Sequence, residues 1–145
     1  MKNFPTIKSG LFYFAHPYTV QDAAGNYMLA AEDANFRLCC WRSAQLILRS
    51  YLIFSPVCHS HPIHIASPEL LANSEHDAWH DFDNRVIESV IWAGIILAPG
   101  WQNSAGCVRE KATFEQMGLP VLYYENIVKE CEPFLLNRGT CSLTA

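Results

Sequence analysis

The feature that most constrains the fold is the alternation of short apolar runs with longer segments of helical period. Apolar runs of strand length occupy 10–15, 52–57, 94–98 and 121–124. Apolar residues recur every three or four positions in 30–51, 76–90 and 104–117, and we expect a terminal helix at about 127–135. Strands that alternate with helices predict a doubly wound, flavodoxin- or Rossmann-like α/β fold. This is a three-layer sandwich around a parallel sheet of four to five strands, with any ligand at the carboxyl ends of the strands.

Two local interpretations follow from the same patterns. In the first helical segment, the spacing of Leu38, Trp41 and Leu48 predicts the face that packs on the sheet. The second apolar run contains Pro56, which we expect to end the strand and to begin a polar loop over about 58–74. A loop of that length is usually functional.

Length and charge limit the classes of protein that this sequence can belong to. With 145 residues, half of them apolar, the chain can bury one core, so we expect a single domain over 1–145. The net charge is −4 and no basic cluster is longer than a pair, which argues against a nucleic-acid polymer as partner. No apolar run is long enough to span a bilayer and no signal-peptide pattern opens the chain, so we expect a cytoplasmic protein without a membrane partner.

The six cysteines are scattered through apolar segments without CxxC spacing. We expect free, mostly buried thiols rather than a disulfide framework.

Glu110 is the candidate residue that the pattern singles out most clearly. On a helical wheel it falls beside Cys107, Phe114 and Met117, a face that should pack on the sheet. A carboxylate there is costly unless it is paired, shifted in pKa or held for function. The alternative is that Glu110 pairs with a neighbouring basic residue or reaches solvent.

Five sequence segments resemble a known group of proteins. The segment SAGCVRE at 104–110, followed by GLPV at 118–121, resembles the signature of the nucleoside 2-deoxyribosyltransferase-like superfamily. Within that superfamily the sequence is most similar to the domain-of-unknown-function 1937 family, through YFAHPYT at 13–19, FSPVCHSH at 54–61 and PGWQNS at 99–104.

The resemblance implies an enzyme that cleaves or exchanges the N-glycosidic bond of a nucleoside or nucleotide. It would be a deoxyribosyltransferase or a nucleoside 5′-monophosphate N-glycosidase that needs no cofactor and pairs with copies of itself. Glu110 would be the nucleophile that attacks the anomeric carbon, and Tyr18 the second catalytic residue. The remaining candidates for substrate binding lie in the predicted loops and flanking helices: Tyr13, His16, Arg37, Ser55, His59, His61, Asp83, Trp101, Ser104 and Gly106. Ser104 and the backbone at Gly106 form a helix N-terminus that suits a phosphate.

Two positions depart from the superfamily's pattern. The superfamily places an aspartate near the third strand to handle the leaving base, but 89–109 contains no acid. Asp77, Asp81 and Asp83 are the nearest replacements, and Asp83 follows Trp79 at a Trp-x-x-x-Asp spacing; each is otherwise a solvated or capping residue. The family also has a small residue more often than a histidine where His16 lies.

The histidines raise the question of a metal site. His59 and His61, and likewise His76 and His80, have spacings that metal ligands use. No acid or cysteine completes a known signature, so we expect no metal. His59 and His61 are interpreted as pocket residues that bind phosphate or base, or else as part of a loop held by its own hydrogen bonds.

Arg37 can reach Glu110 or a phosphate, or it can pair with Glu32, Asp33 or solvent. The rival to the enzyme is a nucleotide-binding or sensing module with the same pocket but no turnover. A flavodoxin-like electron carrier is disfavoured because the loop after the first strand lacks a glycine-rich phosphate nest.

Overall fold

The computed structural model describes residues 10–67 and 75–132. Its centre is a sheet whose strands are all parallel and are ordered β2-β1-β3-β4. The strands are β1 (Leu11–Ala15), β2 (Leu52–Phe54), β3 (Trp92–Leu97) and β4 (Val121–Tyr123). The order reverses after β2, so the chain crosses back over β1 to reach β3. This confirms the doubly wound α/β fold.

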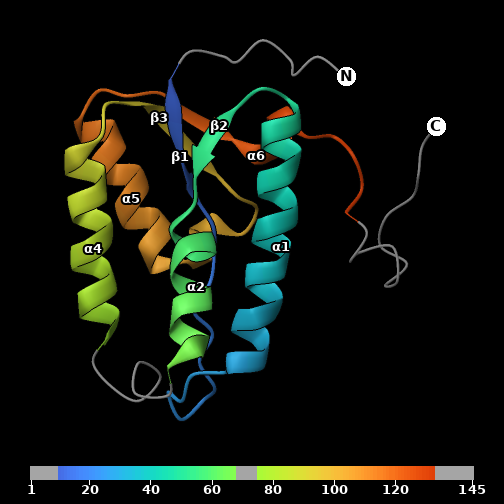
Figure 1. The fold of residues 1–145 in the computed structure, drawn as a ribbon, viewed down its shortest axis with the longest axis vertical. Coiled ribbons are helices and arrows are strands. Elements are labelled where there is room, and N and C mark those ends of the chain that lie inside the picture. The colour runs from blue at the N-terminus through green and yellow to red at the C-terminus, as the bar shows by residue number, and fades with distance from the viewer. Residues whose placement is uncertain (1–9, 68–74, 133–145) are drawn as a thin grey trace.

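Helices cover both faces of the sheet (Figure 1). They are α1 (Leu29–Leu48), α2 (Pro56–Ala66), α4 (Glu75–Ser89), the 3-10 turn η1 (Trp101–Asn103), α5 (Ala105–Gln116) and α6 (Tyr124–Ile127). α1 and α6 cover one face, and α4 and α5 the other. α2 leaves the carboxyl end of β2 and packs against α1.

The strands supply side chains to both layers of the core, since successive residues of a strand point to opposite faces. Phe12 and Phe14 pack with the α1 layer, whereas Tyr13 and Ala15 pack with the α5 layer. Ile95 and Leu97 lie in that second layer with Phe114. Burial on both faces explains why the central strands β1 and β3 read as continuous apolar runs.

The packed face of α1 differs from the predicted one. Leu48 is 68 % exposed, and the buried residues are Glu32, Cys39, Arg42, Ser43 and Leu46. The prediction was wrong because it sought an apolar stripe, whereas three of the five buried residues on this face are polar or charged. Arg42 forms a two-pronged ion pair with Glu132, with both N–O distances 2.7 Å.

The predicted loop over 58–74 is also wrong in its first part, because residues 56–66 form α2. Ser55 caps this helix by accepting the backbone N–H of Cys58 at 3.3 Å. Pro56 occupies the first turn, where a missing N–H costs nothing. The rest of the expected loop, 68–74, lies outside the described residues.

The terminal helix expected at 127–135 is not found in its described part: α6 spans Tyr124–Ile127, and 128–132 are not helical. Residues 133–135 lie outside the described part of the chain. Among the helices that the structure describes, none combines the length and apolar character of a membrane span.

The described cysteines are mostly free thiols, as expected. Cys39, Cys40, Cys58 and Cys107 are free, of which Cys39 and Cys107 are buried. Cys131 differs from the expectation because it forms a disulfide.

Candidate functional site

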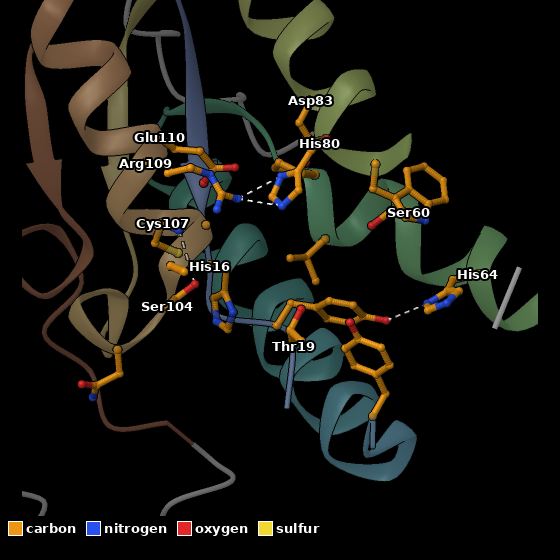
Figure 2. Close-up of a pocket in the computed structure, with 18 of the residues that line it drawn as sticks. His16, Thr19, Ser60, His64, His80, Asp83, Ser104, Cys107, Arg109 and Glu110 are labelled. Carbon is orange, nitrogen blue, oxygen red and sulfur yellow. Dashed lines mark hydrogen bonds between the residues drawn. The ribbon is translucent and has the colours of Figure 1, made fainter. Parts of the chain in front are cut away.

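A pocket of about 460 Å³ opens at the carboxyl ends of β1 and β3 (Figure 2). Its walls come from the loop after β1, from α2, from α4 and from the first turns of α5. The predicted site residues that line it are His16, Tyr18, Asp83, Ser104, Gly106 and Glu110. This volume falls in the range of sites for small organic ligands.

Glu110 lies on the sheet-facing side of α5, as its helical position predicts. Its carboxyl accepts a hydrogen bond from the Tyr13 hydroxyl at 2.7 Å. Burial raises the pKa of Glu110 to about 8, although the Tyr13 hydrogen bond opposes that shift. The nearby charge of Asp83 raises the pKa further, and Arg109 lowers it. The carboxyl group is therefore mostly protonated in the empty pocket at neutral pH.

Asp83 reaches the same space from α4, opposite Glu110 (Figure 2). Burial raises its pKa to about 6, and its Oδ1 atom has no hydrogen-bond partner. An unpaired buried carboxyl oxygen is costly and marks a place where a ligand atom could bind. Of the acids considered from sequence, Asp81 is exposed, and the side chain of Asp77 lies outside the described part.

The charge of Asp83 contributes to the raised pKa of Glu110, so the ionisation of one carboxyl affects the other. Asp83 loses its proton at about pH 6 and Glu110 at about pH 8. Between these values the pair holds one proton. A pair in which one member is protonated and the other is ionised can supply an acid and a nucleophile to the same ligand.

Tyr18 belongs to a chain of hydrogen bonds that leads away from the pocket. Its hydroxyl lies 2.6 Å from Nδ1 of His61 and 3.3 Å from Nδ1 of His64. His61 is fully buried, stacks near Phe36, and contacts Asp33 through Nε2 at 3.0 Å. His61 thus lies between Tyr18 and Asp33 and is within hydrogen-bond distance of both, which fixes the Tyr18 hydroxyl in one orientation.

His16 is held in a similar way on the other side of the pocket. Its Nδ1 lies 2.7 Å from the carbonyl of Pro17, and its Nε2 lies 2.8 Å from Nη1 of Arg42. Burial lowers the pKa of His16 to about 4, and the Arg42 charge lowers it further. The ring is therefore neutral, with its acceptor nitrogen occupied by the guanidinium.

The N-terminus of α5 forms the floor of the pocket. Ser104 caps the helix by accepting the Cys107 N–H at 3.3 Å. Arg109, one turn further along, contacts the His80 ring from α4 at 2.8 and 2.9 Å (Figure 2). A helix N-terminus beside a guanidinium and an imidazole suits an anionic group.

Six of the predicted site residues do not line the pocket. Tyr13 and His61 lie behind it and hold Glu110 and Tyr18. Arg37 is 70 % exposed and pairs with Asp33 at 2.8 Å, one of the partners left open by the sequence. Ser55 is the buried cap of α2, and its hydroxyl contacts Cys39 at 3.1 Å.

His59 and Trp101 are likewise used elsewhere. The exposed His59 ring stacks on Phe82, with ring centroids 5.0 Å apart. Trp101 packs against Tyr123 and beneath the Lys111 ammonium. We expected His59, His61, Tyr18, Ser104 and Glu110 to line one cavity, and the structure corrects this for the two histidines because α2 turns them toward other partners.

The sequence interpretation missed several pocket residues. His64, Trp79, His80 and Arg109 all line the cavity. His80 precedes Asp83 by three residues on α4, a spacing that puts both on one helix face, so the period of the helix could have identified it. The other three depend on how the helices pack.

The described residues contain no group of three or more His, Cys, Asp or Glu side chains that could hold a metal ion.

Comparison with known proteins identifies a family. The family model described as "Domain of unknown function (DUF1937)" matches residues 10–126. Every residue that lines the pocket lies within that range. None of the curated proteins matches the sequence.

Proposed function

We propose that this chain, which belongs to the DUF1937 family, cleaves or exchanges the N-glycosidic bond of a nucleoside or nucleotide. The observation that carries the proposal is that two half-buried carboxyls with raised pKa values, Glu110 and Asp83, line one pocket. The link to the nucleoside 2-deoxyribosyltransferase-like superfamily is part of the same proposal and rests on the segments 104–110 and 118–121.

In the proposed reaction the ionised carboxylate of Glu110 attacks the anomeric carbon of the sugar. The bond from that carbon to the base breaks, and the proton of Asp83 passes to the departing base nitrogen. A glycosyl ester forms on Glu110. Water or a second base then attacks the same carbon, releases Glu110 and returns a proton to Asp83 if the acceptor carries one. Asp83 thereby fills the place of the acid missing from 89–109.

The other pocket residues would hold the substrate. Tyr13 donates to Glu110 and stabilises the ionised form that the attack requires. Tyr18, fixed by His61, presents its hydroxyl to the sugar. Ser104, the Gly106 N–H and Arg109 provide donors for a 5′-phosphate, which favours a nucleotide over a nucleoside.

One observation favours a second candidate, a nucleotide-binding or sensing module without turnover. The pKa of about 8 leaves Glu110 largely neutral before a ligand arrives. A neutral carboxyl can donate a hydrogen bond to a base or sugar but cannot act as a nucleophile. For the enzyme, the proton must pass to Asp83 or leave the pocket before the attack.

The test is incubation with ribo- and deoxynucleosides and their 5′-monophosphates, followed by chromatography for free base. Binding of each compound is measured by calorimetry in parallel. We expect base release by the wild type, none by Glu110→Gln, and a loss of about 100-fold or more for Asp83→Asn. Asp81→Asn is the matched control, because Asp81 is exposed on the same helix, and it should retain full activity.

Two outcomes would contradict the proposed reaction. Undiminished base release by Glu110→Gln would exclude Glu110 as the nucleophile. Binding of nucleotides by both wild type and Glu110→Gln, with no base released by either, would establish the non-catalytic module instead.

A further inference from the structure

We propose that Cys58 is a site of reversible oxidation by hydroperoxides, and that Cys40 is the thiol that closes the resulting disulfide. The site lies where α2 packs on α1 and is independent of the proposed glycosidic chemistry.

Three thiols meet at this contact. The Sγ atom of Cys58 lies 3.7 Å from Sγ of Cys40 and 3.7 Å from Sγ of Cys39. The Ser43 hydroxyl lies 3.7 Å from the same sulfur. Cys58 is therefore the centre of the group, and both other thiols can reach it. None of these four side chains lines the pocket.

The surroundings of Cys58 favour its thiolate. It lies in the first turn of α2, where the positive end of the helix dipole stabilises an anion. Hydrogen bonds with Cys39, Ser55, Ser43 and Cys40 lower the pKa of Cys58, with Cys39 first, although burial opposes the shift. Burial raises the pKa of both Cys39 and Cys40. At neutral pH the cluster therefore concentrates its negative charge on one sulfur, and the thiolate is the form that attacks a peroxide.

The exposure of Cys40 and Cys39 decides which of the two forms the disulfide with Cys58. Cys40 is exposed on α1, and Cys58 is partly exposed, so both can meet a peroxide from solvent. Cys39 is fully buried in the core and its sulfur contacts the Ser55 hydroxyl at 3.1 Å. A bond to Cys39 would pull a core side chain out of its packing, whereas Cys40 can move toward Cys58 at the surface.

The chemistry balances with a hydroperoxide as the oxidant. The Cys58 thiolate attacks one peroxide oxygen, the S–O bond forms, the O–O bond breaks, and the departing oxygen takes up a proton to leave as water or an alcohol. The Cys40 sulfur then attacks the Cys58 sulfenic sulfur and loses its proton. The S–O bond breaks, and hydroxide leaves as water. Two thiols lose two electrons, which the peroxide gains.

The disulfide would join α1 to α2, and α2 carries Ser60 and His64 of the pocket wall (Figure 2). Oxidation would therefore tether that wall to α1. Reduction by a dithiol would release it.

The experiment uses the full chain, reduced, desalted and exposed to a small excess of hydrogen peroxide. Remaining thiols are alkylated, and tryptic peptides are identified by mass spectrometry. Trypsin separates 38–42, which holds Cys39 and Cys40, from 50–85, which holds Cys58. We expect a cross-link between these two peptides that dithiothreitol reverses, while the buried Cys107 remains alkylatable after denaturation.

Two variants identify which cysteine forms the disulfide with Cys58. In Cys40→Ser, an exposed substitution, the cross-link should fall at least tenfold and dimedone should label Cys58 as a sulfenic acid. In Cys39→Ala the cross-link should persist. The proposal is overturned if Cys58 is oxidised no faster than Cys107, or if Cys40→Ser forms the cross-link as readily as the wild type.

Discussion

The ionisation of Glu110 affects the free energy of unfolding of the protein. Its folded-state pKa of about 8 exceeds the value of about 4.3 expected in an unfolded chain. Between these values the folded state binds more protons than the unfolded state, so the free energy of unfolding falls as pH rises. The contribution is fully present below about pH 4.3 and is lost by about pH 8. Its size is on the order of a few kcal/mol.

Glu110→Gln should therefore stabilise the protein at alkaline pH, because the amide keeps the Tyr13 hydrogen bond and never ionises. We expect its melting temperature to exceed that of the wild type by several degrees at pH 8.5, with the gap closing toward pH 5. Thermal unfolding followed by circular dichroism measures this. The exposed Glu115→Gln on the same helix is the control. A gap that does not change with pH would show that burial does not raise the pKa of Glu110 as described.

The shared proton also predicts the pH dependence of base release. Below about pH 6 both carboxyls are protonated and no nucleophile exists; above about pH 8 both are ionised and no acid exists. The plot of kcat/KM against pH should be bell-shaped between these limits. In Asp83→Asn the acid is absent, so a weaker activity should instead rise with pH. A wild-type profile that is flat from pH 5 to 9 would contradict the pairing.

The sequence predicts on which face of its helix Glu110 lies, but it does not predict the contacts among the other residues of the site. One helix and its period suffice to place Glu110 beside Phe114 on the packed face. The contact of His61 with Tyr18 and Asp33 joins residues far apart in the chain and depends on how α1 and α2 pack. A helical wheel contains no information about such contacts.

Among the elements, β3 packs closely at Gly94 against the residue that precedes β4. A Cβ atom added there would lie 2.6 Å from the Pro120 carbonyl oxygen, which also accepts the Ile95 N–H at 3.0 Å. Gly94→Ala should therefore cost about 1–3 kcal/mol of stability. The control is Gly106→Ala in α5, where the nearest atoms lie 3.9 Å away and alanine favours the helix. Urea unfolding compares the two, and equal stability of both variants would show that β3 and β4 are not so close.

The strands could be predicted from sequence because each reads as an apolar run, and the central strands β1 and β3 are buried on both faces. α2 could not be predicted in the same way, because Pro56 is compatible with two local structures. A proline stops a strand, but it also begins a helix when a capping residue such as Ser55 precedes it. Choosing between them requires the position of the chain after β2, which is set by tertiary packing.

For the molecule as a whole, the fold class could be inferred from the alternation of strands and helices. The contacts between segments far apart in the sequence could not. Arg42 and Glu132 join α1 to the segment after α6 in a buried ion pair. Neither residue has a partner nearby in sequence that would reveal this. The local indication of this ion pair is a charged residue on the packed face of a helix, and it does not identify the residue with which the charge pairs.

The protein as a whole is expected to work without a metal ion. The charged groups of the pocket are carboxyls and an arginine, and the described residues include no group of three or more His, Cys, Asp or Glu side chains that could hold a metal ion. Elemental analysis of protein purified without chelator should show transition metal well below one equivalent. A stoichiometric metal that chelation removes together with base release would contradict this.

The central claim is that Glu110 and Asp83 share one proton in one pocket at neutral pH. The most direct measurement is a titration of the side-chain carboxyl carbons by ¹³C NMR, which requires no substrate. We predict two resonances with midpoints near pH 6 and pH 8, one lost in Asp83→Asn and the other in Glu110→Gln. If every carboxyl carbon titrates below pH 5, the pair is not buried as described and the proposed chemistry loses its basis.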